Sequence, residues 1–291
     1  MHIGIALPTA VRHADPRVIP RWATAAEQAG FATLGSTGRY AYPAVSDTVA
    51  LAAAAAVTSR IELLSHIMIA PSWPAALLAK EVAGIDAVSG GRLTLGIGLG
   101  TRPDDFVVPG LGLRGRGKRL DADLRTYRSV WRGEPVADGE NPAVPDGTRH
   151  IPLLFGASSE AALQRAAREG EGFIGPSVPA PMAGPSFDAA RAAWSAAGRT
   201  SPPRLVALAY FGFGDVERSR AAVQDFYASH TLTAGLAETV AGGVAVGAAE
   251  IRHTVAAYQD MGVDDLIFLP SADDLDALTQ LADCVLQGSA K

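Results

Sequence analysis

Residues 80–102, KEVAGIDAVSGGRLTLGIGLGTR, constrain the fold of this chain more than any other stretch. The stretch begins with apolar Val82, Ile85 and Val88 at helical spacing, turns at two glycines, and continues as an apolar run that ends in further glycines. A helix, a tight glycine turn, a buried strand and an open loop form a helix-to-parallel-strand crossover. Ligands of α/β proteins bind at the carboxyl ends of such strands, so we expect a site near Arg102.

The rest of the chain repeats this alternation of strand and helix. We expect strands at residues 2–7, 31–36, 61–69, 92–98, 151–155, 172–174, 205–211 and 266–269. We expect helices at residues 18–30, 47–58, 74–88, 118–131, 158–168, 187–197, 216–229, 248–261 and 273–286. Alternation at this count favours a closed α/β barrel of the TIM (β/α)8 type over an open doubly wound sheet. No composition break divides residues 1–291, so we expect one domain, with residues 133–150 as a long connection inside it.

Composition excludes several classes of partner and compartment. Of the 291 residues, 48% are apolar, which supports a large core, and the net charge of −5 is spread without runs. This charge pattern argues against nucleic acid and against an anionic membrane as partners. The single cysteine, Cys284, leaves no internal disulfide and fits a reducing compartment. With no leader pattern and no apolar stretch of spanning length, we expect a cytoplasmic protein.

Five further runs are characteristic: EQAGFATLG, DAVSGGRLTLGIGLG, RGKRLDADLRTYRSVWRGEPV, IPLLFGASSEAALQRAAREGEGFI and AAYQDMGVDDLIFLP. Together they resemble the bacterial luciferase-like flavin-dependent oxidoreductases and monooxygenases over most of the chain. The resemblance implies a barrel that holds FMN, or the deazaflavin coenzyme F-420, at its carboxyl mouth. It also implies a homodimer formed through the second and third helices, of which the second is rich in alanine.

The third strand is where the resemblance places the flavin ring. In the family this strand ends in a bulge, often with a non-prolyl cis peptide, behind the isoalloxazine, and the matching bond here is His66–Ile67. We therefore predict that Ser65, His66 and Ile67 contact the cofactor and that His66 takes part in catalysis. The alternative is that His66 is only a polar residue at the end of a strand.

A loop of small residues follows the fifth strand. Gly156, Ala157, Ser158 and Ser159 precede an alanine-rich helix, whose N-terminus attracts an anion. Both this pattern and the resemblance indicate a site for the flavin phosphate, although ordinary helix capping gives the same pattern. Gly175, at the end of the sixth strand, is predicted to line the same side.

Two arginines are candidates for binding anions. Gly98 and Gly100 are predicted to let the cofactor pass closely, and Arg102 to bind a phosphate or a substrate anion, unless it is a solvated loop charge. At the end of the second strand the family's F-420-dependent dehydrogenases often carry Asp-His, whereas this chain has Gly38-Arg39. We predict that Arg39 is catalytic, binding an anionic substrate or the pyrimidine edge of the flavin.

Other kinds of site find no support in the sequence. The histidines show no metal-binding spacing with carboxylates, so we predict no metal; they are His2, His13, His66, His150, His230 and His253. No G-x-S-x-G elbow accompanies a triad, and GIGLGT fits the dinucleotide fingerprint poorly and lies at the fourth strand.

The leading hypothesis is a luciferase-like monooxygenase that uses O2 and reduced FMN, supplied by a separate flavin reductase, on a small organic substrate. Its alternative is an F-420-dependent reductase or dehydrogenase that transfers hydride, although the missing histidine argues against the usual proton donor. A third hypothesis is a non-catalytic flavin-binding or partner subunit.

Overall fold

The computed structural model describes residues 1–137, 139–228 and 234–286. Within these ranges eight parallel strands form a ring in the order β10-β1-β2-β3-β5-β6-β7-β8, which pairing of β8 with β10 closes. Two short strands pair in parallel with the carboxyl ends of longer ones, β4 with β5 and β9 with β8. The bounds are β1 His2–Ala6, β2 Thr33–Ser36, β3 Glu62–Ser65, β4 Met68–Ile69, β5 Leu93–Gly98, β6 Leu153–Gly156, β7 Gly172–Ile174, β8 Arg204–Gly212, β9 Ala245–Val246 and β10 Asp265–Pro270.

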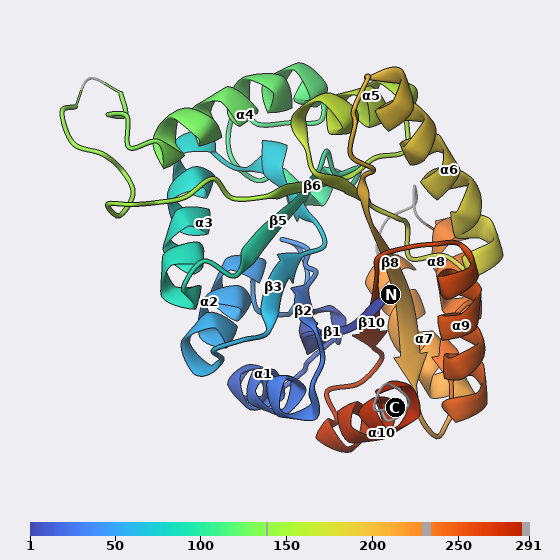
Figure 1. Cartoon of the computed structure of the whole chain (residues 1–291). Coiled ribbons are helices and arrows are strands. Elements are labelled where there is room, and N and C mark those ends of the chain that lie inside the picture. The colour runs from blue at the N-terminus through green and yellow to red at the C-terminus, as the bar shows by residue number, and fades with distance from the viewer. Residues whose placement is uncertain (138, 229–233, 287–291) are drawn as a thin grey trace.

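Helices surround the strands and cover the outside of the barrel (Figure 1). Their bounds are α1 Val18–Ala29, α2 Asp47–Val57, α3 Ala75–Ser89, α4 Arg116–Trp131, α5 Glu160–Glu169, α6 Ala180–Ala196, α7 Val216–Ala228, α8 Ala234–Gly242, α9 Ala248–Asp260 and α10 Leu275–Val285. Short 3-10 turns are η1 Pro8–Ala10, η2 Ala70–Ser72 and η3 Pro103–Asp105. The described parts of the connection from α4 to β6, residues 132–137 and 139–152, project beyond the ring of helices near α3 (Figure 1).

The first helix shows how the local sequence produces this packing. Ile19, Trp22 and Ala26 recur at helical spacing on α1, and all three are buried. Gly30 ends the helix in a left-handed conformation with φ 93°, where its N–H donates to the Ala26 carbonyl. The chain can therefore turn directly into β2.

Alternating residues of each strand supply two separate layers of core. On β8, Val206 and Leu208 point into the barrel, while Leu205 and Ala207 pack against the surrounding helices. The barrel interior is thus filled with side chains and is not a pore. At the amino ends of the strands Arg204 donates to Asp265 over 2.7 Å and to Glu62 over 3.0 Å, linking β8, β10 and β3.

The closed barrel and all eight predicted strands are confirmed. The third strand is interrupted, because β3 and β4 are separated by His66 and Ile67. The predicted start of the helix at residue 187 is wrong: α6 begins at Ala180 and contains Pro185. Helix α8 was not predicted, and the last residue of the predicted helix 216–229 lies outside the described residues.

Candidate active site

His66 lies at the carboxyl ends of the strands, which form the mouth of the barrel. Its backbone N–H donates to the Ser36 carbonyl of β2 over 2.8 Å, and the His66–Ile67 peptide bond is cis, as the resemblance implies. The ring packs on Gly35, where a Cβ atom would lie 2.3 Å from His66 Nε2. His66 is only 2% exposed, and neither ring nitrogen forms a hydrogen bond with another described residue.

Burial lowers the pKa of His66 to about 4, because the charged imidazolium loses its hydration. The ring is therefore neutral at pH 7, with one nitrogen that donates and one that accepts. Two unsatisfied nitrogens on a buried ring make His66 a candidate for contact with a bound molecule.

Ser65 has a structural partner in the sheet. Its hydroxyl accepts from the Gly96 N–H over 2.9 Å and donates to the Gly96 carbonyl over 2.8 Å. The hydroxyl thus joins β3 to β5 where the ladder is interrupted. A cofactor contact of Ser65 would have to come from its backbone.

The predicted glycines make room for isoleucines of this chain. A Cβ on Gly98 would lie 2.1 Å from Ile67 Cδ1, and one on Gly156 would lie 2.7 Å from the same atom. A Cβ on Gly100 would lie 2.5 Å from Ile69 Cγ2. The ends of β3, β5 and β6 therefore meet at Ile67, and the space expected for a cofactor beside these glycines holds protein side chains.

The β6–α5 loop has the expected capping geometry. Ser159 caps α5 by accepting from the Ala162 N–H over 3.4 Å, while Ser158 and Ala157 precede it and Ser158 is exposed. Gly175, in contrast, is buried against Phe187, whose Cζ would lie 2.4 Å from its Cβ. Packing alone explains Gly175.

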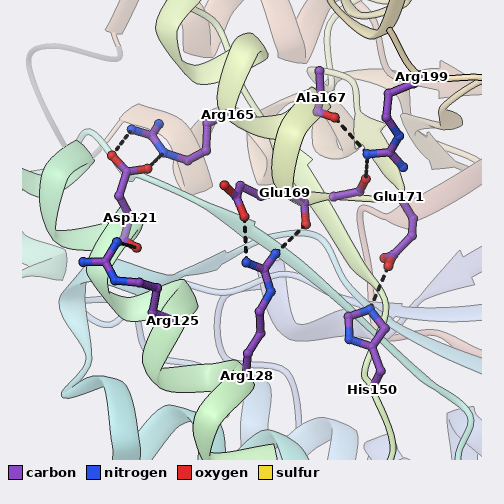
Figure 2. Close-up of polar contacts among 10 residues, drawn as sticks. Asp121, Arg125, Arg128, His150, Arg165, Ala167, Glu169, Glu171 and Arg199 are labelled. Carbon is purple, nitrogen blue, oxygen red and sulfur yellow. Dashed lines mark hydrogen bonds and ion pairs between the residues drawn. The ribbon is translucent and has the colours of Figure 1, made fainter. Parts of the chain in front are cut away.

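Helix α5 is anchored to α4 by polar contacts, so the loop before it has a fixed position. Arg165 donates to Asp121 over 2.6 Å and to the Gly117 carbonyl over 3.2 Å. Figure 2 shows Asp121 and Arg128 of α4 facing Arg165 and Glu169 of α5. Because Gly117 is near the N-terminus of α4, the N-termini of both helices lie on the same side of the barrel.

Arg39 and Arg102 were predicted to bind anions of a ligand. They lie near each other, and each contacts groups of this chain. The side chain of Arg39 is fully buried and donates to the Phe226 carbonyl of α7 over 2.8 Å and to Asp104 over 3.0 Å. The guanidinium of Arg102 lies 5.6 Å from the ring of Phe226 and 3.9 Å from Asp105. Burial, with the like charge of Arg39, lowers the pKa of Arg102. Arg39 therefore joins loops of the mouth to α7, a contact that sequence reasoning missed.

A small cavity of about 70 Å³ opens beside these residues. It is lined by Gly38, Asp47, Met68, Ile69, Trp73 and Asp105, among others. The sequence identified Asp47 only as a residue at a helix start, because its neighbours come from other elements. No spacing within the sequence could have linked it to Asp105.

Among the described residues no group of three or more histidine, cysteine or carboxylate side chains could hold a metal ion, and His230 lies outside them. Over that same part of the chain, no helix is both long and apolar enough to cross a membrane.

Residues 1–265 match the family model of the luciferase-like monooxygenases, and the chain belongs to that family. An uncharacterized protein of Mycobacterium tuberculosis is 31% identical over 175 residues, which is 50% of this chain and 61% of that protein. The match thus spans less than two thirds of that relative.

Solved structures share the fold over the whole chain. Monooxygenase RslO1 from Streptomyces bottropensis superposes with a TM-score of 0.76 at 23% identity, covering 100% of both chains. An F420-dependent secondary alcohol dehydrogenase, in complex with an F420-acetone adduct, superposes with a TM-score of 0.79 at 14% identity, covering 98% of both chains. At these identities the likeness concerns the fold alone.

Proposed function

We propose that this protein is a flavin-dependent oxidoreductase, and specifically a monooxygenase that uses reduced FMN and O2 on a small organic substrate. Membership of the luciferase-like monooxygenase family supports the reaction class. The observation that locates the site is the buried His66 ring at the mouth of the barrel, whose two nitrogens have no hydrogen-bond partner among the described residues.

Ile67 and His66 would form the surface behind the flavin ring. Ile67 lies across the ends of β5 and β6 and offers an apolar contact, while His66 offers a donor and an acceptor beside it. A planar, mostly apolar ring with polar edges fits such a surface. FMN, when bound, supplies the electrons for oxygen chemistry, and the protein's part is to position it and to exclude water.

The phosphate end would bind at Gly156, Ala157, Ser158 and Ser159. The exposed Ser158, the backbone N–H groups of the loop and the N-terminus of α5 suit a dianion. Arg165 holds α5 against α4, which keeps this anion site in place.

Coenzyme F-420 is the second candidate, with hydride transfer as its reaction. The fold likeness to an F420-dependent dehydrogenase favours it, whereas Gly38-Arg39 in place of Asp-His argues against it. A non-catalytic flavin-binding or partner subunit is the third hypothesis, and turnover of any flavin would eliminate it.

The partners we propose are a separate flavin reductase, which supplies reduced FMN, and a second copy of this chain. Exposed apolar residues on α2 and α3, Val49 at 59%, Val57, Leu77 and Val88 at 60%, support a homodimer through these helices.

An anaerobic titration with oxidised FMN, reduced FMN and coenzyme F-420, followed by absorbance and fluorescence, tests the proposal. Tightest binding of reduced FMN, with O2 incorporated into a substrate after oxygen is admitted, is the expected result. Tightest binding of F-420 would favour the second hypothesis, a reductase or dehydrogenase that transfers hydride. Binding of none refutes the proposed function.

A pair of variants tests whether the β6–α5 loop binds the flavin phosphate. Ser158→Asp with Ser159→Asp should weaken flavin binding at least tenfold by charge repulsion. Ser201→Asp, an equally exposed serine ahead of β8 at the other end of the barrel, should leave it unchanged. Equal flavin affinities of the loop variant and the Ser201→Asp control would show that the β6–α5 loop does not bind the flavin.

A further inference from the structure

The cavity at the mouth brings together two carboxyl groups from different elements. Asp47 lies in the first turn of α2 and accepts one hydrogen bond, from the Ser36 hydroxyl over 2.9 Å. Asp105 lies in η3 and is only 2% exposed; its Oδ1 accepts from the Tyr40 N–H over 2.9 Å. Its Oδ2 is buried and has no hydrogen-bond partner in the part of the chain that the structure describes, and Arg102 lies 3.9 Å from it.

The charges around the cavity balance only when one carboxyl group is neutral. Arg39 is paired with Asp104, and Arg102 lies nearest Asp105. Two arginines thus match two aspartates, and Asp47 is a third carboxyl group, with no cation in contact among the described residues. Neighbouring carboxylates with little access to water cannot both ionise cheaply, so a proton is best placed on Asp47.

The groups that face Asp47 act in opposite directions. Burial, and then the negative charge of Asp105, raise the pKa of Asp47, while the hydrogen bond from Ser36 lowers it; the result is a pKa of about 6. The N-terminus of α2 also favours the ionised form. Asp47 is therefore poised to change its protonation state near neutral pH.

Asp47 also occupies the position of a missing side chain at the end of β2. A Cβ atom on Gly38 would lie 2.8 Å from Asp47 Oδ1, so the carboxyl group fills the space into which a residue at position 38 would point. Met68, Ile69 and Trp73 line the same cavity, and Met68 follows the His66–Ile67 segment directly. The acid thus lies next to the surface proposed for the cofactor ring.

We propose that Asp47 is the acid that gives a proton to a carbonyl oxygen of a small substrate bound in this cavity. When hydride, or an oxygen nucleophile derived from O2, adds to the carbonyl carbon, the C=O π pair moves onto the oxygen; the O–H bond of Asp47 then breaks as a new O–H bond forms on that oxygen. The electron pair stays on the Asp47 carboxylate, which the Ser36 hydroxyl stabilises, and water at the mouth returns the proton. This rests on the proposed function, since the substrate must lie beside a reduced cofactor, and it holds for FMN and for F-420.

The test uses 2-butanone labelled with ¹³C at the carbonyl, whose stretching band shifts to lower wavenumber when it accepts a hydrogen bond from an acid. Infrared spectra of the full-length protein are recorded between pH 5 and pH 8, with and without FMN or F-420. The wild type should show the shifted band at pH 5, and the band should fall to about half near pH 6 and by a further tenfold between pH 7 and pH 8.

Three variants decide the assignment. Asp47→Asn should remove the pH dependence, because an amide donates at every pH, and Asp105→Asn should move the midpoint to lower pH. Asp123→Asn is the matched control: burial likewise raises the pKa of Asp123 of α4 to about 6, but Asp123 does not line the cavity. The control should behave as the wild type.

Two results would overturn the proposal: a wild-type band that is absent or independent of pH, or the same midpoint in Asp47→Asn as in the wild type. Failure of both cofactors to bind would instead refute the proposed function. The ketone measurement without cofactor would still decide the role of Asp47.

Discussion

The pH dependence of stability gives a quantitative test of the His66 environment. The pKa of His66 is lowered by burial from 6.5 to about 4, and its ring nitrogens have no partner among the described residues. In the unfolded chain the imidazole takes up its proton near pH 6.5, whereas in the folded chain it does so near pH 4. The folded state therefore loses stability as the pH falls from 6.5 to 4.

The magnitude follows from the two pKa values. A difference between 6.5 and about 4 corresponds to about 3 kcal/mol of unfolding free energy, most of it lost by pH 4.5. Asp47 and Asp123 act in the opposite sense, because their raised pKa values make the folded state relatively more stable as the pH falls through 6. The pH dependence of the wild-type unfolding free energy would therefore not reveal the contribution of His66 by itself.

The difference in unfolding free energy between the wild type and His66→Gln isolates the contribution of the histidine. Urea unfolding at 25 °C between pH 4.5 and 7.5 should show the variant gaining on the wild type by about 2–3 kcal/mol at the acid end. His253→Gln, which removes an exposed histidine of α9, controls for loss of an imidazole. Parallel curves for wild type and His66→Gln would mean that the ring is hydrated or paired, and would refute the proposed surface behind the flavin.

Three further predictions concern packing, capping and assembly. Gly98→Ala should cost about 1–3 kcal/mol in urea unfolding, because its Cβ would lie 2.1 Å from Ile67 Cδ1. Adding Ile67→Val, which removes that atom, should recover much of the loss, and simple additivity would contradict the contact. Ser159→Ala should cost about 1 kcal/mol through loss of the α5 cap, whereas Ser158→Ala should cost little; equal losses would disprove the cap. Val49→Glu with Val88→Glu should convert a dimer into a monomer in light scattering, while Val216→Glu on α7 should not; an unchanged mass for the first pair would exclude the α2–α3 interface.

The strands were predictable because each is a short apolar run between turn residues, and most predicted bounds lie within two residues of the observed ones. Helix α6 was predicted to start late because Pro181 and Pro185 made its first half resemble a loop. Proline is tolerated in a first helical turn, where the missing N–H has no partner, but Pro185 lies deeper. Burial of Ala183 and Phe187 against the barrel shows that packing outweighs this local preference.

The candidate site was predictable where a single segment forms it and not where distant segments meet. The cap at Ser159 follows from a run of a few residues, and the cis bond at His66–Ile67 was implied by the family resemblance of the single segment that contains it. Arg39 contacts the Phe226 carbonyl, 187 positions away, and Asp47 faces Asp105 across a cavity. These contacts between distant residues depend on how the barrel closes, and a local sequence pattern does not predict that.

The glycines at the mouth of the barrel show how one side chain can require glycine at more than one position. Read alone, Gly98 and Gly156 suggest clearance for a ligand, yet a Cβ at either position would meet the same atom, Ile67 Cδ1. Because Gly98 and Gly156 lack side chains, the Ile67 side chain can pack closely on the ends of β5 and β6. Ile67 follows His66, whose buried ring is neutral at pH 7. Under the proposed function, a planar cofactor ring would gain dispersion energy by packing on Ile67, and the two glycines would serve the cofactor by fixing the position of that side chain.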